Sequence, residues 1–197
     1  MLPWAHRTSV LFRLASALDY LHEGCEVQIV HGDIKSSNVL LDHFLEPKLC
    51  DFGCARVGFS ATVTRSANQM MGSLGYVDPH YVRTGLVSKK GDVYSFGVLI
   101  LELVTGTEAF DSEKEQLLTT VMRPVLRVVD GEERIRVGEF VDPKLGDAYD
   151  VNEVLVMTAI AAKCLAEQPA LRPSMGDVVK MMGEKACVIL PKGEKDV

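Results

Sequence analysis

The stretch DVYSFGVLILELVTG, from Asp92 to Gly106, leaves this chain few ways to fold. Read as a helix, it is apolar on nearly every side, which predicts a helix buried in the middle of a domain. It falls short of the roughly 18 apolar residues that a membrane span needs, and Glu102 interrupts it. Other elements of the same chain must therefore cover this helix.

Three other segments have helical patterns. Leucines recur at three- and four-residue steps from Ser9 to Glu23, which predicts a helix with one apolar face. Asp150 stands at a helix start, and Ser174 with Asp177 matches a capping box that begins another helix. Charge, glycine and proline mix from Thr107 to Tyr149, so we expect a connecting excursion with a short helix there.

Two short β-rich runs, VQIVH and PKLCDF, flank a polar loop, and we expect them to form a pair of small strands. Residues 59–71 lack periodicity and hold many small polar side chains, which predicts a long mobile loop. No internal repeat or second domain stands out. Together the patterns predict a mainly α fold with a small β component.

The composition of the 197 residues, 47% apolar and 24% charged, is typical of a soluble globular domain. A formal net charge of -6 leaves no broad basic surface for nucleic acid. The opening residues MLPWAHR lack the basic start and apolar core of a secretory signal, and no membrane segment is expected. The five cysteines are odd in number and irregularly spaced, which argues against a disulfide framework, so we expect a reducing, cytosolic setting.

Polar residues interrupt the apolar run of IVHGDIKSSNVLLD, residues 29–42, which predicts a loop held rigidly and aimed at something charged. The apolar residues 39–41 are expected to anchor this loop in the core. Asn38 follows Asp33 by five residues, and Asp51 of the DFG run comes thirteen residues later. Oxygen atoms of Asn38 and Asp51, on neighbouring loops, can hold Mg²⁺, which takes its other ligands from water and phosphate. This pair of ligands therefore predicts a binding site for a nucleotide.

Asp33 lies near this pair and can accept a proton from a hydroxyl group, while the ammonium of Lys35 can offset negative charge on a phosphoryl group. A lone Asp or Asn in a loop is ordinarily a turn-former. The joint spacing of Asp33, Asn38 and Asp51 favours the chemical interpretation over that one.

The run HGDIKSSN followed by DFG resembles the catalytic loop and the metal-binding loop of eukaryotic protein kinases, and this double signature is highly specific. LPWAHR, GSLGYVDPHY, the buried helix and RPSM are similar, in this order and at fitting intervals, to plant receptor-like serine/threonine kinases. The resemblance spans residues 1–185, with 186–197 as a tail. It implies the large, mostly helical C-lobe of a protein kinase, which is part of an α+β fold when the full domain is present.

The resemblance assigns chemical roles to five residues. It implies that Asp33 is the catalytic base and that Lys35 contacts phosphate. It makes Asn38 and Asp51 the Mg²⁺ ligands and places Leu40 beneath the adenine of ATP. The implied cofactors are ATP and Mg²⁺, and the implied substrate is a protein with a serine or threonine hydroxyl.

Five further residues support the site on the same resemblance. Ser73 matches a hydroxyl that positions the substrate loop, and Asp92 matches a buried aspartate that hydrogen-bonds the catalytic-loop backbone. His31 and Phe52 would stack in a spine that links the metal loop to the central helix. Gly53 completes the DFG motif.

The chain departs from the kinase pattern at Gly32, where an arginine is usual. The cationic pocket that would hold a phosphorylated activation loop is then missing, as in the kinases called non-RD, so we do not expect control by that switch. Thr62, Thr64 and Ser66 are candidate phosphorylation sites, but an exposed polar loop has such residues in any case.

Two further departures concern stability and completeness. His80 stands where the family has the glutamate that pairs with Arg172, so we expect Arg172 to lose a buried partner and His80→Glu to stabilise the fold, unless another acid compensates. Nothing in the chain resembles the Gly-rich strand pair, the strand lysine or the helix glutamate of the small lobe. Half of the ATP cleft is then not encoded, and we expect this polypeptide alone to be inactive.

Two classes of function stay open at this point. The chain is part of a serine/threonine protein kinase, or it is a non-catalytic, pseudokinase-like scaffold that binds kinase partners such as other receptor-like kinases. The intact catalytic residues favour an enzyme, whereas the missing lobe favours an inactive polypeptide. In both cases we expect a cytoplasmic location, at the plasma membrane if the chain is part of a longer receptor-like kinase.

Overall fold

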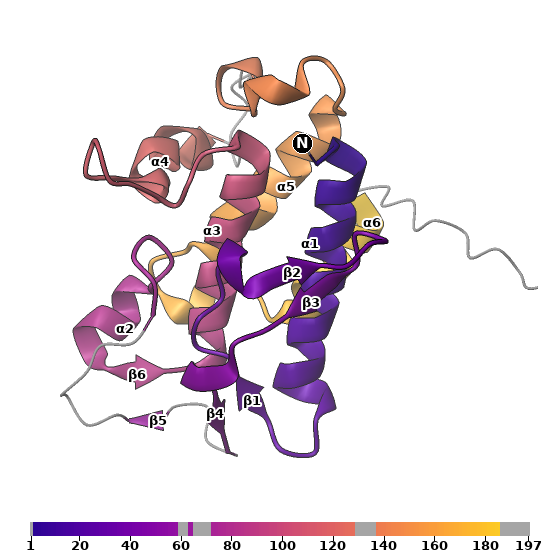
Figure 1. Cartoon of the computed structure of the whole chain (residues 1–197). Helices are drawn as coiled ribbons and strands as arrows, with labels where there is room; N and C mark the ends of the chain where they lie inside the picture. Colours follow the sequence, from indigo (N-terminus) through magenta and orange to yellow (C-terminus); the bar gives the residue numbers. More distant parts are fainter. Residues whose placement is uncertain (1, 59–62, 65–71, 129–136, 186–197) are drawn as a thin grey trace, which may run out of the picture.

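Helix α3, Lys89–Thr105, runs through the centre of the computed structural model, as its apolar pattern predicted (Figure 1). Three helices contact it: α1 (Trp4–Asp19), α4 (Leu118–Val128) and α5 (Val151–Cys164). Helix α6, Met175–Lys185, packs on α1 and α5. The structure describes residues 2–58, 63–64, 72–128 and 137–185. Within these ranges, no helix is both long and apolar enough to cross a membrane.

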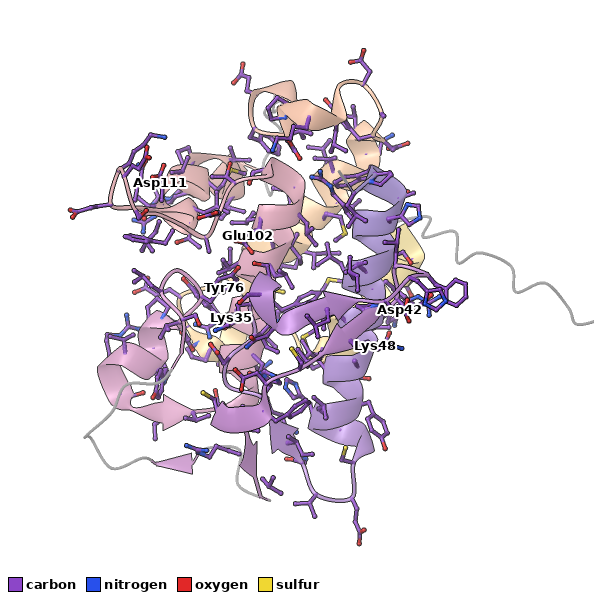
Figure 2. All side chains as sticks on the ribbon, in the orientation of Figure 1. Lys35, Asp42, Lys48, Tyr76, Glu102 and Asp111 are labelled. Atoms are coloured by element: carbon purple, nitrogen blue, oxygen red, sulfur yellow. The ribbon has the colours of Figure 1, made fainter. Side chains whose placement is uncertain are left out.

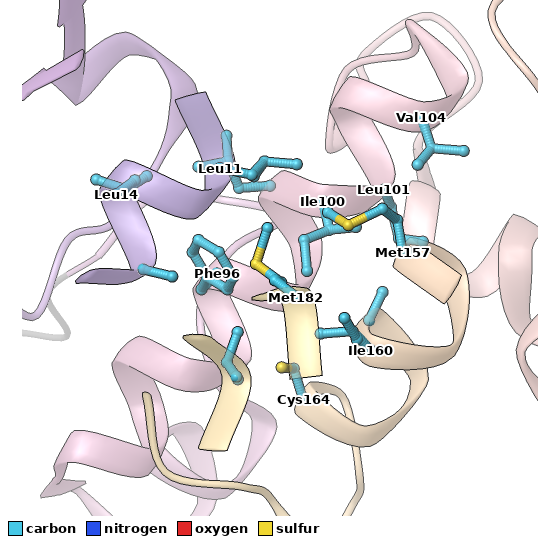
Figure 3. Packing of buried hydrophobic residues seen from close by; sticks show 14 of the residues in the cluster. Leu11, Leu14, Phe96, Ile100, Leu101, Val104, Met157, Ile160, Cys164 and Met182 are labelled. Atoms are coloured by element: carbon cyan, nitrogen blue, oxygen red, sulfur yellow. The ribbon is translucent and has the colours of Figure 1, made fainter. Parts of the chain in front are cut away.

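The hydrophobic core is built around α3, which buries side chains on all of its faces. Phe96 of α3 has no exposed surface and belongs to one cluster with Leu11 of α1, Met157 of α5 and Met182 of α6 (Figure 3). Full burial of a side chain of this size contributes about 1.5–3 kcal/mol. The position of α3 is therefore fixed by packing from several directions.

Most helix boundaries follow the predicted signals. Asp150 caps α5 by accepting two backbone hydrogen bonds from its first turn, at 2.7 and 3.0 Å. Ser174 and Asp177 form the predicted capping box, because each accepts the backbone N–H of the other, at 2.9 and 3.1 Å. Helix α1 begins at Trp4, earlier than the leucine pattern indicated, and it continues into a π-helical turn, Tyr20–Gly24.

The strands of the described residues are short and form four antiparallel pairs. The pairs are β1, Ile29–Val30, with β4, Arg56–Val57; β2, Val39–Leu41, with β3, Pro47–Leu49; β5, Val63–Thr64, with β6, Leu86–Val87; and β7, Phe110–Asp111, with β8, Gln116–Leu117. Both β-rich runs contain a small strand, as expected, and each pairs with another strand: β1 with β4, and β3 with β2. β2 and β3 are joined by a short turn, so their pairing costs less loop-closure entropy than a pairing of β1 with β3.

The remaining elements are short. They are helix α2, Pro79–Thr84, and 3₁₀ turns at Ser36–Asn38, Phe52–Cys54, Val137–Glu139, Pro143–Leu145 and Pro169–Leu171. The excursion predicted over residues 107–149 contains the β7–β8 hairpin and the short helix α4. Of the loop predicted over residues 59–71, only strand β5 lies within the described residues.

Arg172 is paired with Asp78, so another acid does replace the missing glutamate. The guanidinium makes a two-pronged contact, with Nη1 2.6 Å from Oδ2 and Nη2 2.8 Å from Oδ1. Both side chains are almost completely buried, and the guanidinium carbon lies 5.0 Å from the centre of the Tyr94 ring. Asp78 also caps α2 by accepting the backbone N–H of His80 at 2.8 Å. Arg172 therefore already has a counter-charge, and we no longer expect His80→Glu to stabilise the fold.

Asp78→Asn should lower the free energy of unfolding by about 3–5 kcal/mol, because it leaves Arg172 buried without a counter-charge. Chemical denaturation of the 197-residue chain measures this loss. Asp42→Asn, in the solvent-screened pair with Lys48, is the matched control and should cost much less. His80→Glu should leave the thermal midpoint unchanged, and a clear rise would show that Asp78 does not balance Arg172.

Candidate active site

The polar loop after β1 is held from the first turn of α3 by Asp92, of which only 2% is exposed. Asp92 Oδ2 accepts the backbone N–H of His31, and Oδ1 accepts the backbone N–H of Gly32, both at 2.8 Å. The Nε2 atom of His22, on the π-helical turn after α1, lies 2.9 Å from Asp92 Oδ2. One buried carboxylate thus joins the loop to two helical segments.

Gly32 adopts a backbone conformation that favours glycine, with φ at 80°. A Cβ atom at this position would lie 3.0 Å from the carbonyl oxygen of Cys54. The loop conformation that directs the backbone N–H groups of His31 and Gly32 toward Asp92 would therefore be strained by a residue with a side chain at position 32.

Asp33 is the centre of a group of polar side chains. Its Oδ1 accepts the Ser73 hydroxyl at 2.9 Å, and its Oδ2 lies 2.9 Å from Lys35 Nζ. Lys35 Nζ also donates to Ser73 Oγ at 2.8 Å, and Asn38 Nδ2 donates to the Asp33 carbonyl oxygen at 2.9 Å and to its Oδ2 at 3.2 Å. The structure thus brings four of the predicted site residues together.

The environment of Asp33 favours its ionised form. Burial alone would raise the pKa of this carboxyl group, but the hydrogen bonds from Lys35 and Ser73 and the charge of Lys35 outweigh burial and hold the pKa below its ordinary value. A carboxylate that is ionised and fixed in this way can accept a hydrogen bond or a proton from an incoming hydroxyl group.

The ring of His31 joins the catalytic loop to the segment before DFG. Its Nδ1 accepts the backbone N–H of Asp33 at 3.3 Å, and its Nε2 lies 3.0 Å from the carbonyl oxygen of Cys50. This arrangement makes Nε2 the protonated nitrogen. The His31 ring also meets the Phe52 ring edge to face, with centroids 4.8 Å apart. The two predicted spine residues are therefore in contact.

Asn38 and Asp51 are brought to neighbouring positions by the β2–β3 ladder. The backbone N–H of Cys50 donates to the Asn38 carbonyl oxygen at 2.9 Å, one step beyond the paired strands. Asp51 follows in the left-handed region, with φ at 59°, and its Oδ1 accepts the backbone N–H of Gly53 at 3.2 Å. Among the described residues, Asn38 Oδ1 and Asp51 Oδ2 accept no hydrogen bond, so this pair could hold a divalent cation.

The expected apolar anchor at residues 39–41 is confirmed only for Val39, which packs against the main core cluster. Leu40 and Leu41 are 57% and 40% exposed on β2, whereas Ile34, inside the polar loop, is completely buried. Leu40 and Leu41 are consecutive and point to opposite faces of β2, so the core covers neither face at this end of the strand. The exposed Leu40 is nevertheless free to meet a ligand.

The candidate phosphorylation sites are only partly covered by the structure. Thr62 and Ser66 lie outside the described residues. Thr64 belongs to β5, where its backbone pairs with Leu86 of β6.

Two residues of this site escaped the sequence interpretation. His22 stands four residues after the buried Leu18 and continues the apolar face of α1, so its burial could have been inferred, but its contact with Asp92 could not. Tyr76 belongs to the run GSLGYVDPHY, but nothing in that run indicated that its hydroxyl accepts the backbone N–H of Ser36, at 3.2 Å.

Comparison with known proteins gives a consistent result. The family model described as protein kinase domain matches residues 2–182. A rice protein, salt tolerance receptor-like cytoplasmic kinase 1 of Oryza sativa subsp. japonica, is 50% identical over 191 residues, which are 96% of this chain and 51% of that protein.

Two proteins of Arabidopsis thaliana are also similar. A probable receptor-like protein kinase is 46% identical over 190 residues, which are 90% of this chain and 56% of that protein. A receptor-like cytosolic serine/threonine-protein kinase is 39% identical over 195 residues, which are 98% of this chain and 41% of that protein. The chain thus spans about half the length of these relatives.

Lys35→Met should raise the pKa of Asp33, because burial of the carboxylate would remain while its strongest counter-charge is gone. Carbon-13 NMR titration of the Asp33 carboxyl group measures this pKa. Lys48→Met is the matched control, since Lys48 pairs with the distant Asp42 on the β2–β3 hairpin and should leave Asp33 unaffected (Figure 2). An equal pKa in the parent chain and in Lys35→Met would contradict the role given to Lys35.

Proposed function

The chain belongs to the protein kinase domain family and is similar to plant receptor-like kinases, and on this premise we propose that it carries the catalytic loop of a serine/threonine protein kinase. Such an enzyme moves the γ-phosphoryl group of ATP to a serine or threonine hydroxyl of a protein substrate. The observation that carries the proposal is the hydrogen-bonded group of Asp33, Lys35 and Ser73. We expect residues 1–197 to need a kinase small lobe for activity.

The proposed chemistry of the chain's own residues follows from their contacts. Asp33, whose ionised form is favoured by Lys35 and Ser73, accepts the proton of the substrate hydroxyl and orients its oxygen. Lys35 offsets charge on the transferred phosphoryl group. The Ser73 hydroxyl fixes the relative positions of Asp33 and Lys35, because it hydrogen-bonds both side chains.

ATP and Mg²⁺ are used by the protein kinase family in general, and the donor atoms of this chain fit them. Both amide hydrogens of Asn38 are oriented by Asp33, so the Asn38 oxygen is the atom left for a cation, and Asp51 is an exposed carboxylate nearby. Mg²⁺ takes only a few oxygen ligands from a protein and completes its coordination with oxygen atoms of water and phosphate. When bound with ATP, this ion supplies positive charge against the phosphate groups. Leu40 offers the apolar surface on which adenine would rest.

The boundaries, location and partners are part of the proposal. We place the kinase portion at residues 1–185 and a tail at 186–197, and the end of the family match at residue 182 supports this division. A cytoplasmic location is supported by the names of two relatives, which are called cytoplasmic and cytosolic. Other receptor-like kinases are the partners that we would test first.

A hybrid that joins residues 1–197 to a kinase small lobe should transfer phosphate to serine or threonine in a Mg²⁺-dependent reaction. Asp33→Asn should lower its turnover roughly 10²–10⁴-fold with little change in nucleotide affinity, because only the proton acceptor is lost. Asp51→Asn should weaken Mg²⁺-ATP binding as well as turnover. Steady-state kinetics and calorimetry measure the two effects.

The outcome of this experiment also separates the two classes of function. If the hybrid binds Mg²⁺-ATP and Asp33→Asn transfers phosphate at the parent rate, the mechanism is wrong. If the parent hybrid binds nucleotide without any transfer, the scaffold interpretation gains support.

Simultaneous alanine replacement of Thr62, Thr64 and Ser66 should leave the activity of the hybrid within about twofold. The reason is that Gly32 provides no guanidinium to hold a phosphate group on this segment. Kinase assays of the parent and the triple variant, with circular dichroism as the folding control, measure this. A folded but inactive triple variant would overturn the regulatory claim and leave the catalytic one intact.

A further inference from the structure

We infer from the structure that the outer face of helix α4 is an interface between two copies of this chain. Helix α4 and the β7–β8 hairpin before it lie on one side of the molecule, away from α1 and α6 (Figure 1). The inference rests on the side chains of these elements and does not depend on the proposed kinase function.

The inner face of α4 packs on the core, and a second apolar row lies on its outer face. Leu118 and Met122 are each 2% exposed and belong to the main core cluster. Val121 is 50% exposed, and Pro124, three residues later on the same face, is exposed as well. Leu117, 37% exposed, stands four residues before Val121 and continues this spacing. This outer row of Leu117, Val121 and Pro124 therefore faces solvent.

Exposed charges of opposite sign stand at the two ends of the outer row. Glu113 and Glu115 lie in the turn of the β7–β8 hairpin, before the row begins. Arg123 and Arg127 lie one helical turn apart, toward its other end. Among the residues that the structure describes, none of these four side chains forms an ion pair. Contacts within the described chain therefore do not use these charges.

The order of acids, outer row and bases makes this surface complementary to itself. Val121 stands six residues after Glu115 and six residues before Arg127. If two copies of α4 pair antiparallel about a twofold axis beside Val121, the hairpin of one copy lies next to the arginines of the other. The two outer rows then bury each other, and the glutamates of each copy meet the arginines of its partner. The dipoles of two antiparallel helices also attract each other.

Partners with a single sign of charge fit this surface less well. An acidic helix of another protein, or a surface of anionic lipid, would attract Arg123 and Arg127 but would repel Glu113 and Glu115. The dipole of α4 favours acids before the helix and bases near its end, but it gives no reason for an exposed apolar row between them. A second copy of the chain accounts for the charges and for the row.

The contact is small, so the dimer should be weak. Helix α4 has 11 residues and is about 16 Å long, which places the contact at the small end of specific interfaces. We expect the 197-residue chain to dimerise with a dissociation constant of roughly 10–100 µM. Higher salt should weaken the dimer, because the charged contacts lie at the rim and are screened. Sedimentation velocity at a series of concentrations measures both effects.

Val121→Glu tests the outer row, with Phe44→Glu as the matched control. Val121→Glu places a charge at the centre of the contact and should weaken association more than about tenfold. Phe44 is 74% exposed at the β2–β3 turn, and Phe44→Glu should leave association unchanged. Figure 2 shows Asp42 and Lys48 of that hairpin on the opposite side of the molecule from Asp111. Circular dichroism checks that both variants are folded.

Charge-swapped variants test the antiparallel arrangement. One variant combines Arg123→Glu with Arg127→Glu, and the other combines Glu113→Arg with Glu115→Arg. Each variant alone should associate about tenfold more weakly than the parent, because like charges meet at both ends of the contact. An equal mixture of the two should form a heterodimer of about the parent affinity, because opposite charges then meet at both ends.

Each outcome decides the inference. A parent chain that stays monomeric at about ten times the expected dissociation constant overturns it, whether or not the monomer binds vesicles of anionic lipid. A dimer that is lost in Phe44→Glu and kept in Val121→Glu also overturns it, because the interface then lies at the β2–β3 hairpin. A mixture of swapped variants that associates no more tightly than each alone excludes the antiparallel arrangement. None of these measurements uses phosphate transfer, so a failure of the proposed function would be seen separately.

Discussion

The carboxylate of Asp92 is the contact on which the rest of the site depends. It is buried at the start of α3, accepts two successive backbone amides of the catalytic loop and lies against His22. A buried carboxylate without partners is costly, so the loop and the carboxylate stabilise each other. Because α3 is fixed by the core, the loop gains a rigid support. Such support matters for phosphoryl transfer, in which the protein contributes mainly by positioning and electrostatics.

Two buried ion pairs hold the frame around this support. Arg172 meets Asp78, and Arg7 meets Asp142 with 2.6 Å between Nη2 and Oδ2. Each guanidinium also donates to backbone carbonyl oxygens, as Arg7 does to that of Leu103 at 2.7 Å. Burial of two charges costs about as much as their attraction returns, so we infer that these pairs mainly specify which segments meet.

Local signals carried much of the prediction. The apolar pattern of α3, the cap at Asp150 and the capping box at Ser174 were confirmed, because each depends on neighbours within one or two helical turns. The spacing of Asp33, Asn38 and Asp51 identified side chains that the structure places on adjoining segments. Whether these side chains have the predicted chemical roles stays a prediction.

The sequence by itself determined the mainly α fold, the buried central helix and the set of residues from which a phosphate-directed site can be built. Only the tertiary structure decided the partners that hold this site: His22 reaches Asp92 across 70 residues, and Arg172 reaches Asp78 across 94. It also decided that Ile34, and not the exposed Leu40, anchors the loop. The physical reason is that hydrogen-bond and ion-pair partners distant in sequence are set by how helices pack, and periodicity along one segment holds no record of that packing.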